Sequence, residues 1–165
     1  MLSGCVAQGK VDPQKEINEV KGVPTQEEIE YYAVVVATTE LMKEYMDLFS
    51  EVNGEAGKHP SVMQTEKWWE DLSTALISFR VAIDGYNKNE KMPAESQKEI
   101  HELILRTHEP LAYVADNFGD AITNKDADKV NICFDKMGEA REYIDKAIKM
   151  NNKQFEEWEN NAQTQ

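Results

Sequence analysis

The sequence predicts an all-α protein, an antiparallel four-helix bundle whose helices run up, down, up and down. One observation behind this prediction is that apolar residues recur at three- and four-residue spacing through four long stretches between residues 25 and 160, which is typical of helices with one buried face. Another is that short segments rich in polar residues, proline or glycine separate these stretches, because short connections make consecutive helices antiparallel neighbours. A chain of 165 residues is long enough to form one such domain.

The first predicted helix begins at a capping box. The Thr25 hydroxyl can accept a hydrogen bond from the amide of Glu28 while the Glu28 side chain reaches back to Thr25. Gly54 stands where a C-terminal glycine stop is expected. The side chains between them that share one helical face are Tyr31, Val34, Val35, Thr38, Leu41, Met42, Tyr45, Leu48, Phe49 and Val52.

The second predicted helix begins near Pro60, because proline suits the first turn of a helix, and polar residues 87–92 form the turn after it. Its periodicity is the cleanest in the chain. Trp69 lies on the predicted core stripe, whereas Trp68 lies nearer its edge. The stripe consists of Val62, Thr65, Trp69, Leu72, Leu76, Phe79, Ile83 and Tyr86.

Proline marks two places in the third predicted helix. Pro93 opens it, and Pro110 lies inside it. An internal proline removes one backbone hydrogen bond and clashes with the carbonyl group four residues earlier, so a kink or a break is expected near residues 106–110. The predicted apolar face consists of Ile100, Leu103, Ile104, Thr107, Leu111, Val114, Phe118, Ala121 and Ile122.

Asn124 or Asp126 is expected to cap the fourth helix. This helix is predicted to end near residue 160, so the bundle covers residues 25–160 and residues 161–165 form a frayed tail. Cys133 lies on its apolar face and is predicted to be a small buried hydrophobic residue. The face consists of Val130, Cys133, Phe134, Met137, Ile144, Ala147, Ile148, Asn151, Phe155 and Trp158.

The charge of the chain restricts its partners. There are 18 basic and 31 acidic residues, which gives a formal net charge of −13 at pH 7. That charge repels phosphate backbones, so no nucleic-acid partner is predicted. It equally disfavours a basic helix lying on an anionic lipid surface. No run approaches 18 apolar residues, so no membrane-spanning segment is predicted either.

A four-residue pattern follows Met1. An aliphatic residue, two small residues and a cysteine, Leu2-Ser3-Gly4-Cys5, resemble the lipobox of bacterial lipoproteins. The resemblance covers residues 1–5 and implies that the Cys5 thiol carries diacylglycerol. The partner would then be a lipid membrane, bound through acylated Cys5 on its extracytoplasmic side. Residues 6–24 contain scattered Gly, Pro, Lys and Glu and are predicted to be a flexible tether that spans about 24 Å.

One departure from the lipoprotein pattern leaves alternatives open. A full signal has a basic segment and an apolar stretch of roughly 7–15 residues before the lipobox, and here only Met1 precedes Leu2. The signal was cut away, or the start codon lies further upstream, or the match is accidental. In the last case the chain is an acidic intracellular helical protein.

Two histidines of the third helix are candidate site residues. His101 and His108 are seven positions apart and lie on one face, off the apolar stripe. They could hold zinc with Glu102 or Glu109, or form a pH-sensitive patch. Structural zinc sites have four ligands at closer spacing, so two solvated histidines are favoured and no metal or cofactor is predicted.

The remaining candidate motifs also consist of only a few residues. Trp68 and Trp158 could form an aromatic surface for a peptide or glycan, although aromatic residues at the edge of a stripe usually cover a core. Residues 124–128 match the start of a calcium loop, but Lys129 replaces the glycine that the loop needs, and helix capping explains the acidic residues. No catalytic triad, phosphate-binding loop or inward carboxylate pair is found, so no enzyme is predicted.

These observations support three functional hypotheses. The first is a surface-exposed, membrane-anchored lipoprotein that acts as a non-enzymatic binding or accessory module through one face of its bundle, with a protein or another envelope component as partner. The second is a cytosolic acidic helical protein-interaction module. The third is a ligand- or metal-binding helical bundle, which predicts buried polar residues within the apolar stripes. Thr65, Thr107 and Asn151 interrupt those stripes.

Overall fold

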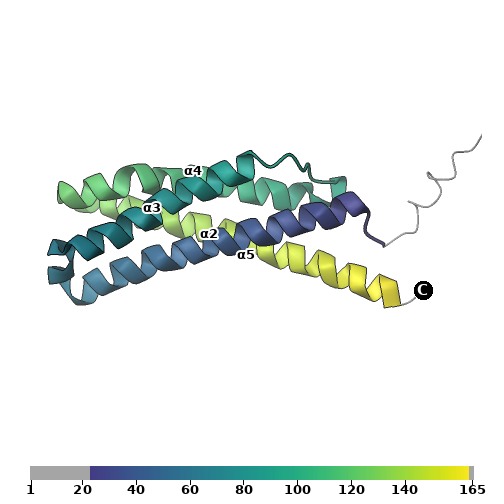
Figure 1. Cartoon of the computed structure of the whole chain (residues 1–165), viewed down its shortest axis with the longest axis horizontal. Coiled ribbons are helices and arrows are strands. Elements are labelled where there is room, and N and C mark those ends of the chain that lie inside the picture. Colours follow the sequence, from purple (N-terminus) through teal and green to yellow (C-terminus); the bar gives the residue numbers. More distant parts are fainter. Residues whose placement is uncertain (1–22, 164–165) are drawn as a thin grey trace, which may run out of the picture.

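A computed structural model describes residues 23–163 of the chain (Figure 1). The predicted lipobox with Cys5 and residues 6–22 of the predicted tether lie outside the described residues. The part that is described contains helices and no strand, which confirms the all-α prediction. Within it, no helix is both long enough and apolar enough to cross a bilayer.

Four long helices lie side by side (Figure 1). α2 packs against α3 and α5, α3 packs against α4, and α4 packs along α5. Two short 3-10 helices, η2 and η3, precede α3 and α4. The bounds are Gln26–Lys58 for α2, Pro60–Gln64 for η2, Glu66–Asn87 for α3, Glu95–Gln97 for η3, Lys98–Thr123 for α4 and Ala127–Gln163 for α5.

The four helices share one core. The Phe49 ring on α2 lies 5.9 Å from that of Phe79 on α3, 4.8 Å from Phe118 on α4 and 6.0 Å from Phe134 on α5, measured between ring centroids. Tilted and edge-on contacts at these distances are the favoured geometry for aromatic rings. Cys133 is buried within this core, as predicted, and its burial raises the pKa of its thiol.

The start of α2 follows the predicted capping box. Thr25 Oγ1 accepts a hydrogen bond from the Glu28 amide at 3.2 Å, and the Thr25 amide donates to Glu28 Oε2 at 2.9 Å. The predicted stop at Gly54 is wrong, because α2 continues to Lys58. Val52 and Ala56 are both buried, so the apolar face of α2 extends past the glycine and tertiary packing outweighs its low helix propensity.

Neither proline begins a long helix, and a 3-10 helix precedes each of α3 and α4. Pro60 begins η2, and α3 begins only after Thr65, whose hydroxyl accepts a hydrogen bond from the Trp68 amide at 3.3 Å. Pro93 precedes η3, and α4 begins at Lys98. Proline fixes one dihedral angle of a first turn, whereas a side-chain cap satisfies an amide that would otherwise lack a partner, so at α3 the cap sets the start.

α4 is continuous through Pro110, so the expected break is absent, and the kink stays a prediction. Pro110 is itself buried, and its neighbours on the inner face, Thr107 and Leu111, are also buried. Burial on both sides of the proline holds one helix together across the single missing hydrogen bond.

Asp126 caps α5, because its Oδ1 accepts a hydrogen bond from the Lys129 amide at 3.0 Å. The other expected cap, Asn124, instead ends α4. Helix α5 extends to Gln163, beyond residue 160 where the sequence predicts its end, so residues 161–163 are helical and not frayed.

Candidate functional site

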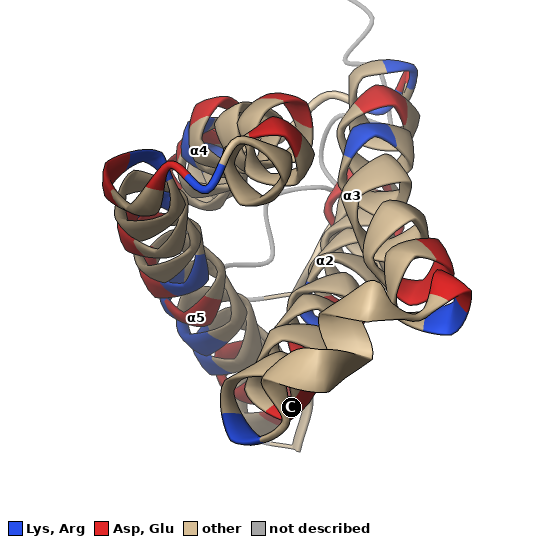
Figure 2. Ribbon diagram, turned by 90° about the vertical axis from the view of Figure 1, so that its left-hand side faces the viewer, with Lys and Arg blue, Asp and Glu red and all other residues tan. Residues whose placement is uncertain are grey.

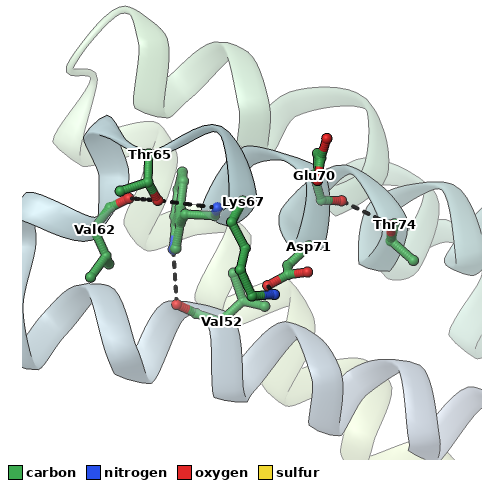
Figure 3. A network of polar contacts seen from close by, with 8 residues as sticks. Val52, Val62, Thr65, Lys67, Glu70, Asp71 and Thr74 are labelled. Atoms are coloured by element: carbon green, nitrogen blue, oxygen red, sulfur yellow. Dashed lines mark hydrogen bonds and ion pairs between the residues drawn. The ribbon is translucent and has the colours of Figure 1, made fainter.

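The two adjacent tryptophans of α3 have exchanged their expected roles. Trp68 is 4% exposed, and its Nε1 donates a hydrogen bond to the carbonyl oxygen of Val52 at 3.0 Å (Figure 3). Trp69 is only half-buried and meets the Trp68 ring edge-on at 5.0 Å. Trp68 therefore belongs to the core and is not a candidate for binding, whereas Trp69 is.

The signal for this exchange was present in the sequence. Counting back from Tyr86 in alternating steps of four and three residues reaches Trp68 and not Trp69. The buried residues of α3 that follow this path are Ala82, Phe79, Ala75, Leu72 and Trp68.

An open apolar groove lies beside Trp69. Its volume is about 620 Å³, and it lies between Met63 of η2, Trp69 of α3, and Ile122 and Val130 on either side of the turn that joins α4 to α5. The other lining residues are Ala121, Thr123, Lys125, Ala127 and Asn131. Trp69 thus presents its ring to a surface that no described segment covers.

A second hollow continues this surface along the outer face of α3. Trp69 lines it together with Ser73 and Ile77, and acidic Glu66 and Glu70 stand at its edge. Ile77 is 63% exposed, and Val81, one turn further along the helix, is 55% exposed. We call the combined apolar surface the Trp69 surface, and it consists of Met63, Trp69, Ile77, Val81, Ile122 and Val130.

The two basic side chains of α3, near the Trp69 surface, are each paired with a carboxylate. Lys67 pairs with Asp71 at 2.7 Å on the side of α3 that faces α2, away from the Glu70 side chain (Figure 3). Arg80 pairs with Asp116 of α4. Figure 2 views the molecule from the end where the groove lies and shows acidic positions on the nearest turns of α3 and α4.

Trp158 lies at the opposite end of α2 from Trp68. Its ring meets Tyr32 edge-on at 5.9 Å, and Phe155 stacks on the same tyrosine at 5.1 Å. Trp68 contacts Val52, which is 20 residues beyond Tyr32 on α2. This separation corresponds to about 30 Å at 1.5 Å per residue. The structure therefore does not bring Trp68 and Trp158 into one aromatic surface, and Trp158 instead attaches the last third of α5 to α2.

His101 is half-buried and belongs to a hydrogen-bonded polar cluster, in contrast to the expected solvated side chain. Its Nδ1 lies 2.8 Å from the hydroxyl of Tyr31 and 2.7 Å from that of Tyr86, and the two hydroxyls are 2.6 Å apart. Both tyrosines are buried, and burial raises the pKa of each.

The protons of this cluster can be arranged in two ways. When Nδ1 of His101 carries no proton, one tyrosine hydroxyl donates to Nδ1 and the other donates to the first hydroxyl, so both protons have acceptors. When Nδ1 carries a proton, it donates to one hydroxyl, and one tyrosine proton is left without an acceptor in the cluster. The geometry thus suits an Nδ1 of His101 that accepts a hydrogen bond from a tyrosine hydroxyl.

His108 lies beside the same cluster and is half-buried, again in contrast to the expected solvated side chain. Its ring meets Tyr86 edge-on at 5.6 Å, and its Nε2 is buried without a hydrogen-bond partner. Burial, followed by the nearby His101, lowers the pKa of His108. Among residues 23–163, no three histidine, cysteine, aspartate or glutamate side chains are placed to hold a metal ion.

Sequence patterns marked only some of the buried polar groups. Asn151 interrupts the apolar stripe of α5, and in the structure its Oδ1 is buried without a partner. Gln97 was missed because it precedes the predicted face of the third helix, although it lies three residues before Ile100. It is fully buried, and its Nε2 donates to the carbonyl oxygen of Glu28 at 2.9 Å.

Comparisons with known proteins give no family. A scan against protein-family models, a search of curated proteins and a search of solved structures each found no match to this chain.

Proposed function

We propose that the chain is a membrane-anchored bacterial lipoprotein that acts as a non-enzymatic binding or accessory module on the extracytoplasmic side. The pattern Leu2-Ser3-Gly4-Cys5 supports the address, with acylated Cys5 as the anchor. One observation carries the binding role: an open apolar groove in which Trp69 is only half-buried. Half-exposed aromatic residues in apolar hollows are typical of protein-binding sites.

We further propose that the helices run up, down, up and down. Two contacts support opposite directions for α2 and α3. Trp68, near the start of α3, bonds to Val52 near the end of α2, while Tyr86, near the end of α3, bonds to Tyr31 near the start of α2. Going along α4, the contacts with α2 move from the start of α2 towards its end. Going along α5, they move from the end of α2 towards its start. They are Gln97–Glu28 and Phe49–Phe118 for α4, and Arg141–Asp47 and Tyr32–Phe155 for α5.

Zero-length cross-linking tests this arrangement. A carbodiimide joins a lysine to a carboxylate that touches it, so mass spectrometry of the digested protein should find Lys91 joined to Glu30 and Lys136 joined to Glu109. Links from Glu30 to Lys125 or Lys129, at the turn between α4 and α5, would contradict the proposed directions.

The start of α2, which follows the proposed anchor in the sequence, and the groove lie at opposite ends of the bundle. The anchor precedes α2, whose 33 residues correspond to a length of about 50 Å. Met63 of the groove belongs to η2, which follows the end of α2. In this arrangement the lipid tethers the bundle through the end where α2 begins, and the groove lies at the other end, free to meet partners.

Lipid labelling tests the anchor. Bacteria that express the gene from its own locus are grown with an alkyne-bearing fatty acid, and the protein is purified and coupled to a fluorophore. We expect label on the wild-type protein and on a Cys133→Ala variant, which keeps Cys5, and loss of label together with release from the membrane fraction in Cys5→Ser. An unlabelled wild-type protein that fractionates with the soluble cell contents would overturn the proposal.

A further inference from the structure

We infer that the Trp69 surface binds a basic amphipathic helix of a partner protein. This inference deepens the binding role proposed above and does not depend on a lipid at Cys5. It starts from the shape of the surface. The groove at the turn between α4 and α5 and the hollow on α3 share Trp69, so an apolar strip runs from Val130 across Trp69 to Ile77.

The strip has the geometry that receives a helix. Trp69, Ser73, Ile77 and Val81 follow one another at four-residue intervals along α3, which forms a ridge on the helix surface. The groove lies at the Trp69 end of this ridge. A partner helix laid along the ridge would bury apolar side chains spaced at i, i+3, i+4 and i+7, the usual pattern of helix-in-groove recognition.

The charge of the rim specifies the partner further. Glu66 and Glu70 line the outer hollow, and Asp84 follows on the same helix, while the two basic residues of α3 are already paired with Asp71 and Asp116. Among the described residues, Lys125 is the one basic residue that lines the groove, so the acidic side of the surface is the α3 side. A helix with lysine or arginine beside its apolar side chains would meet these carboxylates. A second copy of this chain would instead bring another net charge of −13 against them, which opposes self-association.

Peptide binding to the purified full-length chain tests the inference. The probe is a synthetic peptide of about 18 residues with leucine at i, i+3, i+4 and i+7 spacing and lysine elsewhere. A scrambled peptide of the same composition, whose leucines do not share a face, and a peptide with glutamate in place of lysine are the comparisons. Fluorescence anisotropy should give a Kd at least about tenfold lower for the lysine peptide than for either comparison.

Two pairs of variants separate the surface from the overall charge. Ile77→Asn should weaken binding at least about tenfold, whereas Ile132→Asn, at an isoleucine 45% exposed on α5, should leave it unchanged. Both side chains are exposed, so circular dichroism should show an unchanged helix content. Glu66→Lys with Glu70→Lys should transfer the preference to the glutamate peptide, while Glu156→Lys with Glu159→Lys, which changes the net charge equally, should not.

Several outcomes would overturn the inference. They are equal binding of the scrambled peptide, unchanged binding by Ile77→Asn, and equal effects of the two charge-reversal pairs. Sedimentation equilibrium that shows a dimer disrupted by Ile77→Asn would assign the surface to a second copy instead. Fatty-acid labelling reports on Cys5 and peptide binding reports on the Trp69 surface, so failure of one proposal is distinguishable from failure of the other.

Discussion

His108 occupies a half-buried position that favours its uncharged form. It lies half-buried against the edge of Tyr86, with Nε2 buried and without a partner, and the His101–Tyr31–Tyr86 cluster adjoins it. Because burial and His101 lower the pKa of His108 in the folded chain, the unfolded chain binds a proton more readily. The stabilisation that results is complete above the unfolded value near 6.5 and is lost as the pH falls through the lower folded value.

We therefore expect the free energy of unfolding to depend on pH through His108. From pH 7.5 to pH 5, the wild-type protein should lose more stability than His108→Gln, whose side chain does not titrate, as measured by urea denaturation monitored by circular dichroism. His59→Gln removes an exposed histidine of the loop before η2 and is the matched control. Equal pH dependence in the wild-type protein and His108→Gln would show that His108 is not held in its neutral form by the fold.

At the scale of single helices, Gly54 is a position at which the sequence prediction and the structure differ. A glycine stop has a left-handed backbone, in which alanine is strained, whereas Gly54 lies inside α2, where an added Cβ has no atom within 4 Å. Gly54→Ala should therefore raise the free energy of unfolding by about 0.5–1 kcal/mol, because alanine has the higher helix propensity and the less flexible unfolded chain.

Thermal and urea denaturation measure this change. Gly57→Ala, at a second glycine of α2 that also has space for a Cβ, should stabilise the protein to a similar extent. A loss of stability in Gly54→Ala would mean that α2 ends where the sequence predicts.

Features within a single helix could be predicted from the sequence, whereas contacts between helices could not. Periodic apolar faces and the caps at Thr25 and Asp126 are local features, so the sequence was sufficient to predict four helices and two of their starts. The end of α2 depends on the partners that bury Ala56, and the role of Trp68 depends on the carbonyl of Val52, 16 residues away. The His101 cluster joins three helices, and no spacing within one helix reveals such a contact.

At the scale of the whole molecule, the net charge of −13 is distributed so that some carboxylates have neighbours of the same sign. Glu40, Glu44, Asp47 and Glu51 line one shallow hollow on the outside of α2 at three- and four-residue spacing, with Lys43 among them. Like charges at this spacing destabilise a helix by about 0.2–0.5 kcal/mol per pair. Long-range repulsion adds to this, and salt screens it over a Debye length of about 30 Å at 0.01 M and about 3 Å at 1 M.

Neutralising part of this acidic face should stabilise the protein, and the gain should disappear in salt. We expect Glu44→Gln with Glu51→Gln to raise the free energy of unfolding by about 1 kcal/mol in 0.01 M salt, since several like-charge neighbours are relieved and glutamine has a similar helix propensity. In 1 M sodium chloride the difference from wild type should shrink towards zero. Glu139→Gln with Glu142→Gln changes the net charge equally but removes one of the two carboxylate partners of Lys136, which keeps Glu109, and the partner of Lys146, so it should give no gain at either salt concentration. Equal stabilisation by the two pairs would show that total charge, and not its arrangement along α2, limits the stability of the bundle.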